Sequence, residues 1–115
     1  MHSGVIYHVC TAEAWRLAEA DGDYRGSADD RRDGYIHFST RDQVVESVAR
    51  HRAGQHGLVL LDVAADRLGA DLKWEESRRG QLFPHLYAPL PLAAVRRVRP
   101  LPLGPGNLHV FPPLD

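Results

Sequence analysis

The first apolar segment of the chain, residues 5–10, alternates in the manner of a β-strand. The alternation places His8 on the same face as Ile6 and Cys10. Because both faces carry apolar residues, we expect this strand to lie inside a sheet rather than at its edge. Residues 58–63 form the clearest strand of the chain, an apolar run that should be buried on both faces.

Two helices are predicted between these strands. Thr11 is a good N-cap residue, and it predicts a helix over about residues 12–20. Thr40 opens a second helix, over about residues 41–53, because Gln43 stands three residues later in the arrangement of a capping box.

The connection between the two helices, residues 21–33, is polar. It holds five Asp and three Arg and shows no apolar period. We interpret it as a loop with a solvated surface, the alternative being that one of its arginines reaches over a pocket.

The second half of the chain predicts strands with little helix. Residues 72–76 read as a short strand or an extended segment and residues 95–101 as a last strand, and the prolines between 84 and 91 exclude a regular helix there. Asp62 is expected at the exit of its strand, bonded to nearby backbone, with a catalytic role as the alternative.

These patterns together predict the fold class α+β, with strongly twisted mixed or antiparallel sheets and two main helices. Residues 1–101 would form a single globular domain, and residues 102–115 a proline-rich C-terminal tail.

Length, charge and cysteine content narrow the classes of function. A chain of 115 residues has the size of one domain, and its net charge of -1, with a pI of about 6.6, argues against nucleic-acid binding through bulk charge. No apolar run approaches the roughly 20 residues that span a bilayer, and no signal peptide is visible. Cys10 is the only cysteine, which excludes an intrachain disulfide and favours a cytoplasmic location. We therefore expect neither a membrane nor a nucleic acid as a partner.

A candidate ligand site lies in residues 33–40, where one strand ends and a helix begins. His37, Ser39 and the first free N–H groups of that helix should lie close together there. An imidazole beside hydroxyl groups and a helix N-terminus is typical of a small-molecule pocket.

Histidines and glutamates offer further candidate chemistry. His8, His37 and His85 all stand in segments of strong structure, and a metal site of a hydrolase is one interpretation. No His-x-His or His-Glu-x-x-His spacing is present, so separately buried histidines are the alternative and no metal ligand is assigned. The side chains of Glu75 and Glu76 should point to opposite faces of their strand, so one of them could face the pocket and serve general acid–base chemistry. The alternative is that both glutamates are solvated at the end of the strand.

Several segments, in this order, resemble the bacterial family of unknown function DUF952. The resemblance covers about residues 5–101 and rests on Ile6-Tyr-His-Val9, Trp15 in the first helix, Asp33-Gly-Tyr-Ile-His-Phe-Ser-Thr40, Leu58-Val-Leu-Leu-Asp62, Trp74-Glu-Glu76 and Phe83-Pro-His-Leu-Tyr-Ala-Pro-Leu-Pro91. The family's fold is similar to that of ADP-ribosyltransferases, which split NAD in a cleft between two small sheets. NAD is therefore the cofactor that the resemblance implies.

The resemblance also implies roles for individual residues. His8 would hold the ribose and amide end of NAD, Ser39 and Thr40 would shape the nicotinamide pocket, and Glu76 would stabilise the oxocarbenium-like transition state. His37 is a further catalytic candidate, and His85 and Tyr87 would complete the cofactor-binding lining.

Three functions remain open at this stage. The first is a transferase of ADP-ribose acting on NAD or a related nucleotide. The second is a non-catalytic ligand-binding or interaction domain, favoured by the absence of the Glu-x-Glu or Gln-x-Glu pair of such enzymes. The third is the metal-dependent hydrolase that uses His8, His37 and His85.

Overall fold

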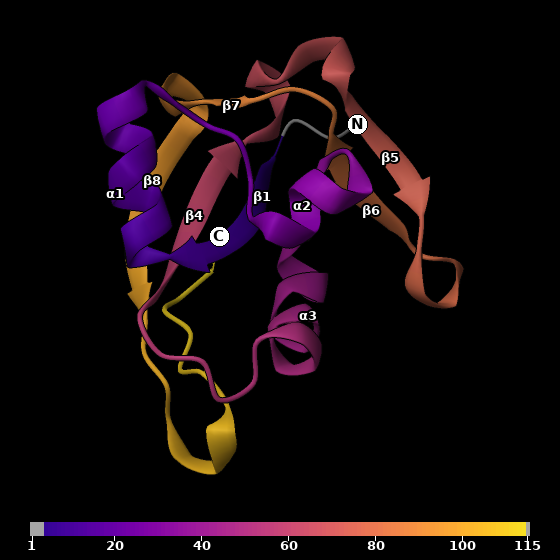
Figure 1. Ribbon diagram of the computed structural model, residues 1–115. Coiled ribbons are helices and arrows are strands. Elements are labelled where there is room, and N and C mark those ends of the chain that lie inside the picture. The colour runs from indigo at the N-terminus through magenta and orange to yellow at the C-terminus, as the bar shows by residue number, and fades with distance from the viewer. Residues whose placement is uncertain (1–3, 115) are drawn as a thin grey trace.

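The fold, taken from a computed structural model that describes residues 4–114, is a mixed α+β arrangement (Figure 1). Three α-helices and eight strands are found within the described residues. The α-helices and strands alternate as far as β4, and the other four strands follow. Their order is β1 Val5–Thr11, α1 Ala12–Asp21, β2 Asp23–Tyr24, α2 Ala28–Asp33, β3 Ile36–His37, α3 Arg41–His51, β4 Leu58–Ala64, β5 Leu72–Glu76, β6 Leu82–Leu86, β7 Leu90–Pro91 and β8 Val95–Leu101.

The strands form three antiparallel sheets, with the orders β1-β4-β8, β2-β7 and β3-β6-β5. The expectation that β1 lies inside a sheet is wrong, because β4 is the central strand and β1 is at the edge. Its outer edge is covered by the segment after β3. Tyr7 and Ser39 exchange two backbone hydrogen bonds of 2.8 Å, which join the first sheet to the third.

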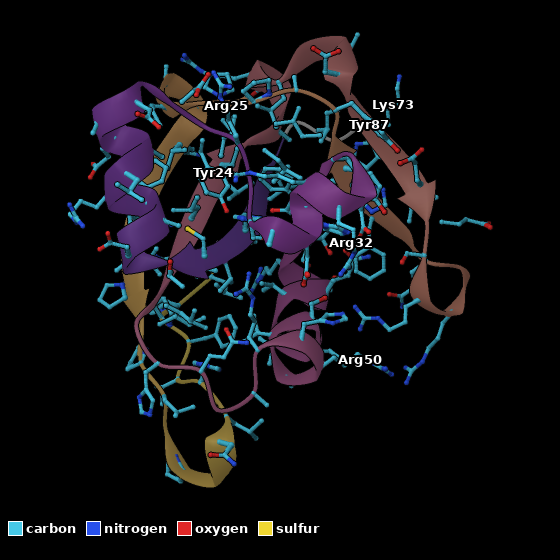
Figure 2. The ribbon with its side chains drawn as sticks, viewed as in Figure 1. Tyr24, Arg25, Arg32, Arg50, Lys73 and Tyr87 are labelled. Atoms are coloured by element: carbon cyan, nitrogen blue, oxygen red, sulfur yellow. The ribbon has the colours of Figure 1, made fainter. Side chains whose placement is uncertain are left out.

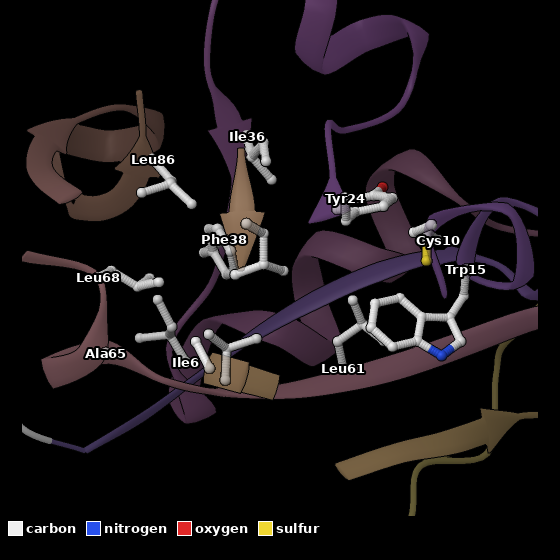
Figure 3. Packing of buried hydrophobic residues seen from close by; sticks show 14 residues of the cluster. Ile6, Cys10, Trp15, Tyr24, Ile36, Phe38, Leu61, Ala65, Leu68 and Leu86 are labelled. Carbon is white, nitrogen blue, oxygen red and sulfur yellow. The ribbon is translucent and has the colours of Figure 1, made fainter. Parts of the chain in front are cut away.

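Both faces of the first sheet are covered. On one face, α1 and strands of the other two sheets enclose a core that contains Trp15, Leu61 and Leu86 (Figure 3). On the other face, Val44 and Val48 of α3 pack against β1 and β4. Burial of apolar area on both sides explains why β4 reads as an almost continuous apolar run.

The predicted N-caps of α1 and α3 are confirmed. Thr11 Oγ1 accepts a hydrogen bond of 3.0 Å from the N–H of Ala14, and the N–H of Thr40 donates to Gln43 Oε1 at 3.0 Å. Thr40 and Gln43 thereby fix the point where α3 starts, directly after the Tyr7–Ser39 bridge.

The interpretation of residues 21–33 as a loop is wrong, because this segment contains β2 and a third helix, α2. Helix α2 has no apolar stripe, and Asp30 is its one buried residue. The signal for it is local: Ser27 and Asp30 form a capping box, and Gly34 ends the helix in the left-handed conformation with φ of 89°.

Asp62 lies inside β4 rather than at the exit of the strand. The expectation that it bonds to nearby backbone is corrected, because its partners are arginine side chains. The residue is fully buried, and its Oδ2 pairs with Nη2 of Arg97 at 2.9 Å and of Arg99 at 2.7 Å. Arg99 also donates to the main-chain oxygen of Pro113 at 2.8 Å, so it holds the C-terminal segment against the sheet. Among the described residues, none of the helices combines the length and apolar character needed to cross a membrane.

Candidate functional site

A cavity of about 240 Å³ lies where the first and third sheets meet α2, α3 and the turn between β5 and β6. Its lining comes from segments far apart in sequence: Tyr7, His8 and Val9 of β1, Ser27 and four residues of α2 (Asp29, Asp30, Arg32, Asp33), His37, Phe38 and Ser39, Val44, Ser47, Val48, His51 and Arg52 of α3 and its end, and Ser77, Arg78, Phe83 and His85. The arginine alternative for the 21–33 segment is therefore right for Arg32.

His8 lines the cavity from β1, and both of its ring nitrogens are already hydrogen-bonded. Nδ1 lies 2.6 Å from the main-chain oxygen of His37, and Nε2 lies 2.7 Å from the hydroxyl of Tyr24. Since a carbonyl oxygen only accepts, Nδ1 carries the proton and Nε2 accepts from Tyr24. Burial lowers the pKa of His8, which agrees with a neutral ring.

His37 on β3 is paired with two carboxylates of α2. Its Nδ1 donates to Asp30 Oδ1 at 2.5 Å, and its Nε2 lies 3.0 Å from Asp33 Oδ2. Both nitrogens donate only in the charged ring, and the hydrogen bond to Asp30 is the main reason why the pKa of His37 is raised. Burial alone would raise the pKa of Asp30, but the side-chain hydrogen bond from His37, followed by the electrostatic effect of His8 and the backbone hydrogen bonds of Ser27 and His37, outweighs it and lowers that pKa to about 2.

The start of α2 positions Asp30. The N–H of Ser27 donates to Asp30 Oδ2 at 2.8 Å, and the N–H of His37 donates to Oδ1 at 3.1 Å. Gly26, at φ of 95°, approaches so closely that a Cβ there would lie 2.6 Å from Asp30 Cβ. The chain therefore holds a buried carboxylate rigidly under the ring of His37.

His85 connects the cavity to a group of rings on the third sheet. Its Nδ1 donates to Glu75 Oε1 at 2.8 Å, and the hydroxyl of Tyr87 donates to the same oxygen at 2.7 Å. These hydrogen bonds, that of Tyr87 first, lower the pKa of Glu75. The ring of Tyr35 stacks on His85 with centroids 4.1 Å apart. Tyr87 lies at the outer surface beside β6 (Figure 2).

The opposite wall of the cavity is formed by α3 and the β5–β6 turn. Arg78 Nη2 donates to Ser47 Oγ at 2.8 Å, and Ser39 Oγ donates to the same hydroxyl at 3.2 Å. Arg52 Nη2 donates to the main-chain oxygen of Val9 at 3.2 Å. This wall therefore presents guanidinium and hydroxyl donors.

The cavity brings together four of the seven residues expected from the sequence: His8, His37, Ser39 and His85. Thr40 instead caps α3, and Tyr87 lines a second pocket together with Tyr35 and Leu86. Glu76 is exposed, because alternation along β5 turns Glu75 toward His85 and sends Glu76 to the other face. This placement corrects the expectation that Glu76 lines the cavity.

Metal binding finds no support in the described part of the chain, where no group of three His, Cys, Asp or Glu side chains is placed to hold an ion. His8, His37 and His85 are each bound to protein oxygen atoms instead.

Sequence reasoning missed the charged residues of the cavity, above all Asp30, Arg52 and Arg78. Asp30 has a local signal in its capping box with Ser27. Arg52 and Arg78 have none, because they reach the cavity through the arrangement of α3 and the β5–β6 turn.

Comparisons with known proteins find a family model and solved structures that are similar to this chain. The model of the family described as protein of unknown function, DUF952, matches residues 9–98. The crystal structure of protein CC0527 from Caulobacter crescentus has 44% sequence identity and a TM-score of 0.90 over 92% of this chain and 93% of that chain. The solution NMR structure of CC0527 has 45% identity and a TM-score of 0.81 over 90% of each chain. Comparison with the curated proteins finds no match. The chain belongs to the DUF952 family.

Proposed function

We propose that the cavity binds NAD or a related nucleotide and that the domain transfers its ADP-ribose group. The observation that carries the proposal is the convergence of His8, His37, Ser39 and His85 on one cavity. The resemblance to ADP-ribosyltransferases implies ligand-binding roles for His8, Ser39 and His85, and His37 is the candidate that the strand-to-helix junction adds. The choice of NAD comes from that resemblance. The residues present fit a ribosyl group, since the carboxylates on one wall are of the kind that accepts hydrogen bonds from ribose hydroxyls.

The transfer would break the bond between the nicotinamide nitrogen and ribose C1′. Nicotinamide leaves as a neutral molecule with the electron pair of that bond, and an acceptor nucleophile bonds to C1′ and loses its proton. Positive charge develops on the ribose, and a preorganised carboxylate lowers its free energy. Asp33, at the wall of the cavity and one-third exposed, is the carboxylate that we assign to this role.

A second candidate function is ligand binding without turnover. It is favoured by the position of Glu76, which is exposed and does not face the ligand. Asp30 is also already engaged, because it accepts hydrogen bonds from His37 and Ser27.

The test combines binding with product release. In a thermal-shift titration, NAD at 100 times its Kd adds about 2.7 kcal/mol of stability, which raises the Tm of a domain of this size by about 10 °C. Nicotinamide release is then followed by chromatography. A shift with release supports the transferase, and a shift without release supports the binding domain. No shift with NAD or ADP-ribose overturns NAD binding.

Paired variants identify the carboxylate that matters. We expect Asp33→Asn to reduce nicotinamide release by at least about tenfold, a change of about 1.4 kcal/mol in the barrier, and Glu76→Gln to leave it unchanged. The reverse result would assign the role to Glu76, as the family resemblance implies. Unfolding curves of both variants serve as the control for folding.

A further inference from the structure

The charges that line the cavity are segregated between its two walls. Three aspartates and Arg32 belong to α2, where the ion pairs of Arg32 and His37 offset the carboxylates. Arg52 and Arg78 stand on the other wall, at the end of α3 and in the β5–β6 turn.

Arg78 is held toward the cavity by the backbone conformation of its turn and by two side-chain contacts. The next residue, Arg79, adopts φ of 58°, a left-handed conformation that is unfavourable for a residue with a side chain. The guanidinium of Arg78 lies over the ring of Phe83, 5.1 Å from its centroid, and donates to Ser47. Its side chain is 22% exposed, so it is partly desolvated before any ligand arrives.

The arginines on this wall and directly beside it outnumber their carboxylate partners. Glu46 is shared by three arginines, with Nε of Arg50 at 3.2 Å, Nη1 of Arg78 at 3.4 Å and Nη1 of Arg79 at 3.8 Å. Arg50 lies on the solvent side of α3 (Figure 2). One carboxylate therefore leaves an excess of positive charge at the edge of the cavity.

Arg52 adds to this excess. The two acceptors described for it are neutral oxygen atoms, the carbonyl of Val9 and the side-chain oxygen of Gln55, each at 3.2 Å. His51 stands beside it, and burial followed by the charge of Arg78 lowers the pKa of His51. Guanidinium groups gathered in a partly desolvated cavity repel one another, and an anion between them removes that repulsion.

We infer that the wall formed by Arg78, Arg52 and Ser47 is an anion subsite that takes the phosphate groups of the ligand. This inference deepens the proposed function and rests on it for the identity of the ligand as a nucleotide. Guanidinium N–H groups and a hydroxyl suit phosphate oxygens, since charge-assisted hydrogen bonds to phosphate are among the strongest in proteins. The ribose then faces the α2 wall, and the phosphates face the α3 wall.

Calorimetric titration of the intact chain with inorganic pyrophosphate, ADP and adenosine tests the subsite. We expect pyrophosphate and ADP to bind and adenosine to bind much more weakly. Arg78→Gln should weaken ADP at least about tenfold, which is about 1.4 kcal/mol. Arg79→Gln is the matched control, because it removes the same charge from the same turn. The side chain of Arg79 is 67% exposed, and its ion pair with Glu46 is long at 3.8 Å.

Ser47→Ala provides a second variant that keeps every charge, and it should weaken ADP without changing the affinity for adenosine. Equal losses in Arg78→Gln and Arg79→Gln, or no binding of pyrophosphate and ADP to the wild type, would overturn the subsite.

The outcomes separate the two proposals. Binding of ADP that depends on Arg78, without nicotinamide release from NAD, rejects the transferase and supports the subsite. Nicotinamide release with an unchanged KM for NAD in Arg78→Gln supports the transferase and rejects the subsite.

Discussion

The imidazole of His8 donates from Nδ1 to the main-chain oxygen of His37 at 2.6 Å and thereby ties β1 to β3 across the floor of the cavity. Its Nε2 accepts from Tyr24 at 2.7 Å. With both nitrogens engaged, the neutral ring of His8 has no hydrogen bond to offer the ribose or amide of NAD, which is the role that the family resemblance implies for it. His8 therefore acts on the site by positioning His37.

Replacement of His8 tests this positioning role. His8→Ala removes two buried hydrogen bonds and leaves a space beside Phe38, whose ring centroid is 5.5 Å away. We expect the free energy of unfolding to fall by about 2–4 kcal/mol, measured by urea denaturation. Arg50→Ala, on the exposed side of α3, should change it by less than about 0.5 kcal/mol. A His8→Ala protein as stable as the wild type would contradict the role.

The protonation of His37 depends on Asp30. Because the hydrogen bond to Asp30 raises the pKa of His37, Asp30→Asn should lower that pKa toward the ordinary value of 6.5. The titration of the ring is followed by NMR. Asp29→Asn, on the same helix and paired with Arg32 at 3.2 Å, should leave the midpoint nearly unchanged. Equal midpoints in wild type and Asp30→Asn would show that the ion pair does not hold the proton.

Asp30 should also govern stability in acid. Its folded pKa of about 2 lies below the ordinary value of 3.8, so the folded state binds this proton more weakly than the unfolded state. The contribution, about 2 kcal/mol, is fully present above pH 3.8 and is lost as the pH falls toward 2. Denaturation curves between pH 2 and 5 should show this loss in the wild type and a smaller one in Asp30→Asn. Parallel pH profiles for the two proteins would refute it.

Substitutions at Gly26 and Gly34 distinguish the cost of backbone strain from the cost of a close contact with Asp30. Gly26→Ala would place a Cβ 2.6 Å from Asp30 Cβ, whereas Gly34, also at positive φ, has nothing within 4 Å of that position. Gly34→Ala should cost about 1–2 kcal/mol through the backbone alone, and Gly26→Ala more, with a lower pKa of His37 as Asp30 is displaced. NMR titration together with thermal unfolding distinguishes the two, and equal effects would mean that the contact with Asp30 is unimportant.

Local signals in the sequence account for much of the fold. Strand β1 follows from apolar alternation and β4 from an almost continuous apolar run, and Thr11 and Thr40 mark the starts of α1 and α3, because caps and apolar patterns act within a few residues. Helix α2 escaped the apolar criterion because it buries a carboxylate instead of an apolar stripe. Its capping box of Ser27 and Asp30 was the available signal.

The site divides in the same way. His37 and Ser39 could be recognised from the strand-to-helix junction, since the chain places them together over three residues. By itself, the sequence determined this junction and the character of the strands around it. Only the tertiary structure decided that His8 and His85 meet His37, that Glu75 rather than Glu76 faces His85, and that Arg52 and Arg78 oppose the carboxylates of α2. The physical reason is that sheet pairing and packing set these distances between segments dozens of residues apart, and local periodicity carries no information about them.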